Sequence, residues 1–416
     1  MLLLVFLAFK SVRSEMRTCA SLIVRNEERV IERFLENNRY AFDHFDFTDT
    51  GSSDKTVEKI RAYLIAHNIS GRVHFYMWAD DFGRARTYAL ERSRETPCAH
   101  YVFLDADDEV WLASQRRLLR ADDREAFINY MKSHCHGVCS TQTLVANGFM
   151  WWRLFAISGN TQGTFKGARH ETIDAPSGTP ASNLDEYIVF AHRDQTRLNR
   201  EPNALIVDGL ALERDVMRGE NAVRAMYYAG QSYEQGGDLE RALSLYRKRV
   251  ATTEGWLQER YVAQLHIGKI LEKQSNFVTA SAEYFKAIEI DSTRAESYYY
   301  LARGFRFSRN YVVCFLLARE GARQKSLSSH LFAEKEVSDF LIIDEAATCG
   351  SYLPDYRIES LEFFFALRKK RPDDKRILDN LLWMNRTLAD AFAANALGGS
   401  SKNRARLLRL WKSNRQ

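Results

Sequence analysis

The sequence predicts an α/β region with a mostly parallel sheet, followed by an all-α region of helical repeats. In roughly the first 200 residues, short apolar runs alternate with helical patterns, as in sheets whose strands are joined by covering helices. After that, small and aromatic residues recur at a spacing typical of tetratricopeptide (TPR) repeats. The whole chain of 416 residues contains only six prolines, which suits a helix-rich protein.

Four apolar runs in the first part of the chain predict strands at residues 18–24, 42–48, 73–76 and 101–104. The polar stretches between them predict helices that begin near residues 25, 55 and 82, and Asp54 can cap the second helix. Later apolar runs, at 150–157 and 187–191, predict further strands of mixed direction. We therefore expect a mixed sheet flanked by helices.

Three stretches fit the tetratricopeptide pattern, at residues 223–256, 261–294 and 295–328. Small residues such as Gly268 stand where paired helices have to approach closely, and Tyr284 takes an aromatic position of the same pattern. The expected division is an N-terminal extension at 1–16, the α/β domain at 17–200, repeats at 201–330, a helical cap at 331–400 and a basic tail at 401–416.

The positive charge of the chain is concentrated at its end. The formal net charge is +5, but the last sixteen residues carry six Lys or Arg and no acid, so the remainder carries −1. This near-neutral body gives no sign of nucleic-acid binding. The tail could form an amphipathic helix on an anionic membrane, or it could simply be solvated. The apolar run at residues 1–9 is far too short to span a bilayer.

Six scattered cysteines in a chain of this size favour a reducing compartment over a disulfide framework. We therefore expect free thiols and a cytoplasmic protein, peripheral to a membrane if the tail binds one. His134, Cys135, His136 and Cys139 have ligand-like spacing, which suggests a structural zinc as an alternative. No second half-site follows at zinc-finger spacing, so the sequence favours no zinc there.

The strongest chemical signal is the acidic group Asp105, Asp107 and Asp108, which directly follows the apolar run at 101–104. Ligands of open α/β sheets bind beyond the carboxyl ends of the strands. Two carboxylates one residue apart can hold a hard divalent cation there, with diphosphate oxygens completing its shell. Such a cation neutralises the charge on a leaving nucleoside diphosphate. The alternative is a solvated acidic turn.

Four sequence blocks that occur in order extend this signal: SLIVRNEE at 21–28, DTGSSDKT at 49–56, DDFGRAR at 80–86 and LDADD at 104–108. Together they resemble the signature of family 2 glycosyltransferases with the GT-A fold, over residues 17–200. A branch of that family with tetratricopeptide repeats after the catalytic domain is similar over most of the remainder. One departure is Thr87, where relatives often carry Asn, so local contacts at this position can differ.

The resemblance implies roles for the residues that follow the first two strands. Val24, Asn26 and Glu27, in the turn after the first strand, would contact the base and ribose of the nucleotide. Asp49, at the end of the second strand, would accept a hydrogen bond from the base. The resemblance does not indicate which base or which sugar the donor carries.

The resemblance also implies a metal site and its partner. Asp105 would face the ribose and the metal, and Asp107 would ligate the metal, which would be Mn²⁺ or Mg²⁺. Arg86 would lie near the diphosphate or brace the acidic pair; a helix-surface arginine is the alternative.

His170-Glu171 resembles the His-Glu block near the end of such catalytic domains. Glu171 could take the proton from an acceptor hydroxyl as general base, although Asp174 or Asp185 could do so instead. His170 could complete the metal shell or donate to a phosphate. His192 matches a further block of the family and could contact the diphosphate or the metal, or could be structural.

These observations predict a metal-dependent glycosyltransferase that moves a sugar from a nucleoside-diphosphate sugar to a hydroxyl of a glycan, protein or lipid acceptor. The family implies inversion at the anomeric carbon. The repeats would bind the acceptor or mediate homo-oligomerisation. A repeat scaffold with an inactive transferase domain is the main alternative. A nucleotidyltransferase is disfavoured, because residues 17–60 contain no glycine- and lysine-rich phosphate loop.

Overall fold

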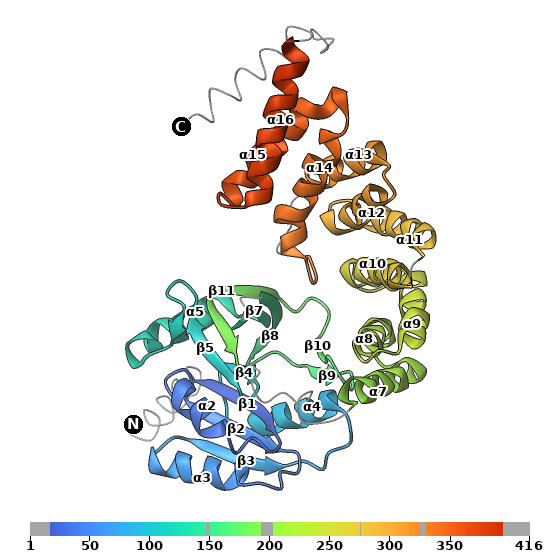
Figure 1. The fold of residues 1–416 in the computed structure, drawn as a ribbon. Helices are drawn as coiled ribbons and strands as arrows, with labels where there is room; N and C mark the ends of the chain where they lie inside the picture. The colour runs from blue at the N-terminus through green and yellow to red at the C-terminus, as the bar shows by residue number, and fades with distance from the viewer. Residues whose placement is uncertain (1–16, 147–149, 193–202, 275, 325–329, 394–416) are drawn as a thin grey trace, which may run out of the picture. The chain divides into compact units, whose positions relative to one another are not determined.

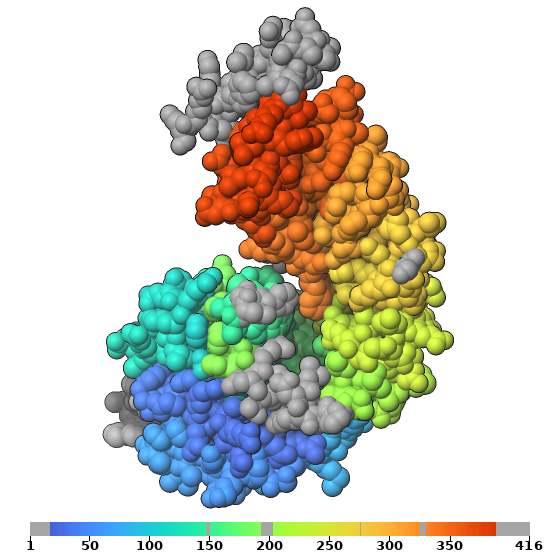
Figure 2. Space-filling view, viewed as in Figure 1, coloured from blue at the N-terminus to red at the C-terminus, as the bar shows by residue number. Residues whose placement is uncertain are grey.

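A computed structural model of the protein describes residues 17–146, 150–192, 203–274, 276–324 and 330–393 (Figure 1). The chain divides into two compact units, residues 1–238 and residues 239–416. Figure 2 shows their atoms in space-filling form, with the first unit blue to green and the second yellow to red. The expected N-terminal extension at 1–16 and basic tail at 401–416 lie outside the described residues.

The first unit is built on a nine-stranded mixed sheet with strand order β3-β2-β1-β4-β8-β7-β11-β5-β6. One half consists of parallel strands, β1 Thr18–Val24, β2 His44–Asp49, β3 Gly71–Phe75 and β4 His100–Leu104. The other half adds β5 Asp108–Leu112, β6 Arg117–Leu118, β7 Val138–Val145, β8 Met150–Ser158 and β11 Ala181–Ala191. A separate antiparallel pair contains β9 Thr164–Lys166 and β10 Thr172–Asp174. The predicted mixed α/β architecture is confirmed.

Helices cover both faces of this sheet. The elements are α2 Ile31–Asn38, α3 Thr56–Ala66, α4 Phe82–Ser93, the short η1 Ala121–Asp123 and α5 Arg124–His134. Successive side chains of a strand point to opposite faces, and β4 follows this rule. Val102 belongs to the same buried cluster as Phe34 of α2, whereas Phe103 belongs to the cluster that contains Leu90 of α4. The sheet is therefore the middle layer of three.

The remainder of the described chain is helical. The first unit ends with α7 Ala204–Arg218 and α8 Ala222–Gln235. The second unit contains α9 Leu239–Ala251, α10 Leu257–Lys273, α11 Phe277–Ile290, α12 Ala295–Phe307, α13 Tyr311–Gly321, η2 Val337–Leu341, α14 Ile342–Ser351, η3 Pro354–Tyr356, α15 Arg357–Lys370 and α16 Lys375–Ala393. The predicted second and third repeats coincide with the hairpins α10–α11 and α12–α13, so the helical repeats resemble TPR units, and α15 and α16 occupy the range of the predicted cap.

Close helix packing explains why these hairpins need small residues. A Cβ atom placed on Gly268 of α10 would lie 2.5 Å from the ring of Tyr284 on α11, closer than real Cβ contacts allow. Tyr284 is fully buried, and its hydroxyl donates to Glu272 over 2.6 Å. The glycine and the tyrosine of the repeat pattern therefore stand opposite each other, as the sequence predicts.

The prediction of free thiols is wrong. All six cysteines are paired in disulfides, Cys19–Cys98, Cys135–Cys139 and Cys314–Cys349. Scattered spacing concealed this pairing because two of the bridges join residues far apart in the sequence. The alternative of a zinc site around Cys135 and Cys139 also fails, since their sulfur atoms bond to each other. In the part of the chain described here, no helix is long and apolar enough to cross a membrane.

Candidate functional site

Hydrogen bonds join the loops that follow β1 and β2 at the carboxyl edge of the sheet. The amide of Thr50 donates to the carbonyl of Val24, and the amide of Asn26 donates to Ser52 Oγ, both over 3.0 Å. The Asn26 side chain accepts from the amide of Ser53 over 2.8 Å. Asn26 has a left-handed backbone, φ +56°, which asparagine tolerates better than most residues. Because residues 25–30 belong to this loop, α2 begins at Ile31 and not near residue 25, where the sequence predicted it.

Asp49 and Glu27 strengthen the same pair of loops. The Asp49 carboxylate is 2% exposed and accepts from the amides of Gly51 and Ser52, each over 3.2 Å. The amide of Glu27 donates to Thr56 Oγ1 over 2.7 Å. The four residues predicted to meet the nucleotide are therefore brought together. Their role in contacting a base or ribose stays a prediction.

Arg86 of α4 joins two of the predicted site residues. Its Nη2 donates to Asp105 Oδ1 over 2.7 Å, and its Nε donates to Glu171 Oε1. Burial opposes the charge on Arg86, but the carboxylates of Glu171 and Asp105 outweigh this effect and raise its pKa. The geometry favours the bracing role predicted for Arg86, because the guanidinium holds the candidate base beside the candidate metal ligand.

A second arginine, Arg153 of β8, contacts the same acidic loop. Its Nη2 lies 2.7 Å from Asp108 Oδ2, and its Nη1 lies 3.7 Å from Asp105 Oδ2. Asp108 Oδ1 is buried without a hydrogen-bond partner among the described residues. Burial raises the pKa of Asp108 to about 7, Arg153 opposes the shift, and the charges of Asp105 and Asp107 add to it. Burial is therefore the main reason why Asp108 holds its proton more strongly than an exposed aspartate.

His170 lies in the same loop as Glu171, and its side chain contacts helix α8 of the first unit. Its ring stacks on Tyr228 of α8, with centroids 4.0 Å apart and 16° between the ring planes. Arg224 Nε donates to the carbonyl of His170 over 3.2 Å. The dense surroundings of the ring and the charge of Arg224 lower the pKa of His170 to about 4, although part of the side chain reaches solvent. The imidazole is therefore neutral at pH 7.

His192, at the end of β11, lies next to the acidic loop. Its amide donates to the carbonyl of Asp107 over 3.3 Å, because β11 pairs antiparallel with β5. Its Nε2 is 2.7 Å from Glu109 Oε1. Glu109 is buried and also accepts from Trp111 Nε1 over 2.9 Å. Glu109 therefore fixes the orientation of the His192 ring and leaves Nδ1 as the nitrogen that can meet a ligand.

The three predicted metal ligands do not form one compact shell. Across the described ranges, the three-residue group with donor atoms within 4.8 Å of one another is Cys314, Glu345 and Cys349, whose sulfur atoms already form a disulfide. Asp105, Asp107 and His170 are not such a group. Any cation held by Asp105 and Asp107 would therefore have to draw its other ligands from a donor molecule or from a different residue.

The two alternative bases have other partners. Asp174 pairs with Lys166 across the small β9–β10 sheet at 2.5 Å. Asp185 accepts from the hydroxyl of Tyr130 over 3.0 Å. Neither has a recorded contact with Arg86, whereas Glu171 does. The geometry therefore favours Glu171 among the three candidates.

Comparison with known proteins assigns no family to the chain. No protein-family model matches it, and no curated protein matches it either. The resemblance to family 2 glycosyltransferases, and with it the GT-A fold, stays a prediction.

Solved structures that match are helical-repeat proteins. The N-terminal domain of stress-induced protein-1 (STI-1) from C. elegans matches with 15% identity and TM-score 0.27, over 32% of this chain and 99% of its own. YrrB, a TPR protein with an unusual peptide-binding site, matches with 18% identity and TM-score 0.31, over 44% and 84%. The TPR2AB-domain:pHSP90-complex of yeast Sti1 gives 14% identity and TM-score 0.23, over 44% and 78%. At these scores, the repeat assignment rests on the packing of the helices themselves.

Three residues of the site had no role in the sequence prediction. Arg153 lies in an apolar, tryptophan-containing strand, and a charged residue within such a strand is itself a signal of a buried ion pair. Glu109 directly follows the three aspartates, and the prediction assigned the metal site to the aspartates and gave Glu109 no role. Tyr228 lies within the stretch 223–256 that was predicted as a repeat, and no local pattern links it to His170.

Proposed function

We propose that this protein transfers a sugar from a nucleoside-diphosphate sugar to an acceptor hydroxyl in a metal-dependent, inverting reaction. The proposal is carried by one observation: Arg86 holds Glu171 beside Asp105, at the carboxyl end of β4. In the strand order, β1 lies between β2 and β4, and this is the point where the sheet reverses its direction of growth. Open α/β sheets bind nucleotides at such points.

The donor atoms fit a hard divalent cation. Asp105 and Asp107 offer carboxylate oxygens, which Mn²⁺ and Mg²⁺ prefer. Asp105 is half-exposed, so a cation in solution can reach its carboxylate. We infer that Asp105 and Asp107 hold the cation and that His192, which is bonded to Asp107 through the backbone, joins them as a ligand only after its ring shifts, because these three residues do not form a compact group before the metal binds. When bound, the cation neutralises the diphosphate leaving group.

Glu171 acts as the base in this proposal. The acceptor hydroxyl gives its proton to the Glu171 carboxylate while its oxygen attacks the anomeric carbon, and the bond from that carbon to the diphosphate breaks. Arg86 fixes the position of Glu171 during this step, which lowers the cost of aligning base and acceptor. His170 is neutral at pH 7 and stacks on Tyr228, so its role is to shape the wall of the site near the acceptor.

Thermal shift with Mn²⁺ and a panel of nucleoside diphosphates tests the proposal. The cognate nucleotide should stabilise the protein, by about 2.7 kcal/mol at a hundredfold excess over its dissociation constant. Asp107→Ala should abolish this effect. Asp122→Ala, the same change at an exposed aspartate of η1, is the control and should retain it. If no nucleotide stabilises the wild-type protein in the presence of Mn²⁺, the transferase proposal is wrong.

The second candidate function is a protein-interaction scaffold. Two observations favour it: the second unit is a helical-repeat array, and a surface hollow of about 390 Å³ is lined by Glu36, Asn37, Tyr40 and residues 117–120 rather than by the predicted site residues. Hydrolysis of the donor sugar separates the two candidates. A transferase should hydrolyse the cognate donor slowly and only with metal, whereas a scaffold should show no metal-dependent turnover.

A further inference from the structure

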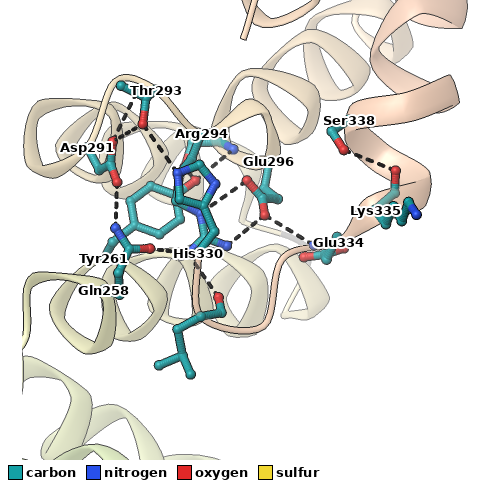
Figure 3. A network of polar contacts seen from close by, with 12 residues as sticks. Gln258, Tyr261, Asp291, Thr293, Arg294, Glu296, His330, Glu334, Lys335 and Ser338 are labelled. Carbon is teal, nitrogen blue, oxygen red and sulfur yellow. Dashed lines mark hydrogen bonds and ion pairs between the residues drawn. The ribbon is translucent and has the colours of Figure 1, made fainter. Parts of the chain in front are cut away.

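A short segment between α13 and α14 packs against the first helices of the repeats in the second unit. Figure 3 shows this segment, which includes His330 and Glu334, lying against α10 and the start of α12. Leu331 and Phe332 lie in a turn, and the next two residues, up to Glu334, have no regular secondary structure. The helices contact the backbone of this segment as well as one of its side chains.

Two buried side chains bind the backbone of the segment. Arg294 Nη1 donates to the carbonyl of Leu331 over 2.9 Å, and Glu296 Oε1 accepts from the amide of Glu334 over 3.2 Å. Arg294 and Glu296 are 0% and 4% exposed and pair with each other at 2.7 Å. The Arg294 guanidinium also lies over the ring of Tyr261, 4.3 Å from its centroid. This buried pair is therefore held in one position, and it binds the carbonyl of Leu331 and the amide of Glu334, three residues further on.

Two further side chains bind the carboxylate of Glu334. Lys269 Nζ of α10 lies 2.9 Å from Glu334 Oε1, and the hydroxyl of Tyr300 on α12 donates to Glu334 Oε2 over 2.6 Å. Lys269 also lies 4.8 Å from the centroid of the Tyr300 ring. The two groups form a receptor for one carboxylate, and charge-assisted hydrogen bonds of this type are the strong ones. Their chemistry selects an acidic side chain.

We infer that this face of α10 and α12 is a binding site for a glutamate-bearing peptide turn, and that the chain occupies the site with its own Leu331–Glu334. The ligand it fits is a segment of a partner protein with a backbone turn that ends in glutamate. Such a segment binds by replacing the chain's own copy. This interaction is separate from sugar transfer, because its residues all lie in the second unit, and its test does not depend on the activity proposed for the first unit.

Hydrogen exchange and peptide binding on the full-length protein test this inference. Glu334→Gln removes the charge that Lys269 and Tyr300 hold, and should speed exchange of the amides at 331–334 by about tenfold or more. The matched control is Glu336→Gln, two residues further on, where the carboxylate contacts Arg371 instead. This control should leave the exchange of 331–334 unchanged.

The probe is a fluorescent, end-blocked peptide with the sequence of residues 330–336. Glu334→Gln should bind it about tenfold more tightly than the wild-type protein or Glu336→Gln, because the internal competitor is weakened. Adding Lys269→Met to Glu334→Gln should remove this binding, as should changing the glutamate of the peptide that corresponds to Glu334 to Gln. Exchange that does not respond to Glu334→Gln overturns the inference. So does faster exchange without peptide binding at about 1 mM, the order of the effective concentration of a tethered segment.

Discussion

Each unit of this protein contains a cluster of charges organised by an arginine, and the two clusters differ in how far water can reach them. In the second unit, Arg294 is fully buried and its partner Glu296 is 4% exposed. In the first unit, Arg86 pairs with Asp105, which remains 50% exposed. A buried cluster holds a fixed shape, whereas an accessible one can exchange its partners with the solvent.

The largest expected difference between the two clusters is in stability. Arg294→Met should lower the free energy of unfolding by about 3–5 kcal/mol, because it leaves the Glu296 carboxylate buried without its partner. Arg86→Met should cost less, about 1–3 kcal/mol, because water can reach Asp105. Chemical denaturation of the full chain measures both. Arg294→Met combined with Glu296→Leu should recover most of the loss, and equal losses for the two arginines would remove the distinction between the clusters.

A smaller effect is expected in the dependence of stability on pH. The pKa of Asp108 is raised from an unfolded value near 3.8 to about 7, mainly by burial. Above about pH 4 the unfolded state has lost this proton and the folded state has kept it, so the contribution of Asp108 falls as pH rises and levels off above about 7. The slope reaches at most about 1.4 kcal/mol per pH unit. Asp108→Asn should remove this slope from the unfolding profile, and an unchanged profile would show that Asp108 ionises normally.

The smallest expected effect concerns the affinity for metal. Glu109→Gln should weaken Mn²⁺ binding by about 10- to 100-fold, because the carboxylate that orients His192 loses its charge. Electron paramagnetic resonance of free Mn²⁺ measures this without any substrate. Trp111→Phe is the control, since it removes a different hydrogen bond to the same carboxylate. Loss of affinity in the control as well would mean that Glu109 acts only as part of the core.

Local patterns in the sequence predicted the elements and the acidic site. Alternation of apolar and polar runs located β1, β2, β3 and β4. Three of these strands, β1, β2 and β4, are almost entirely buried, whereas the edge strand β3 is only partly buried. Asp105 was expected at a strand end because it directly follows a strong apolar run. The resemblance to the glycosyltransferase family placed Arg86 near the diphosphate or in a bracing position, with a helix-surface arginine as the alternative, and in the structure Arg86 contacts Asp105.

Contacts between distant segments could not be predicted in the same way. Arg153 reaches Asp108 only because β8 inserts antiparallel beside β4. Cys314 and Cys349 meet because α13 packs on α14, and no spacing rule links them. Lys269 of α10 pairs with Glu334, although the helices α11, α12 and α13 lie between them in the sequence. Tertiary packing determines each of these pairs.

Contacts between α7 and the sheet region determine where the chain can be cut to express the first unit alone. The carboxylate of Asp208 holds Arg169, and Asp215 accepts from the amide of Ala168 over 2.6 Å. A fragment that stopped at residue 200 would remove both acids. Arg169 would then keep only Asp80 as a carboxylate partner, and the buried amide of Ala168 would lose its acceptor, just before Glu171. An expression boundary after residue 238 keeps these groups covered, and a fragment of the first unit should therefore end there.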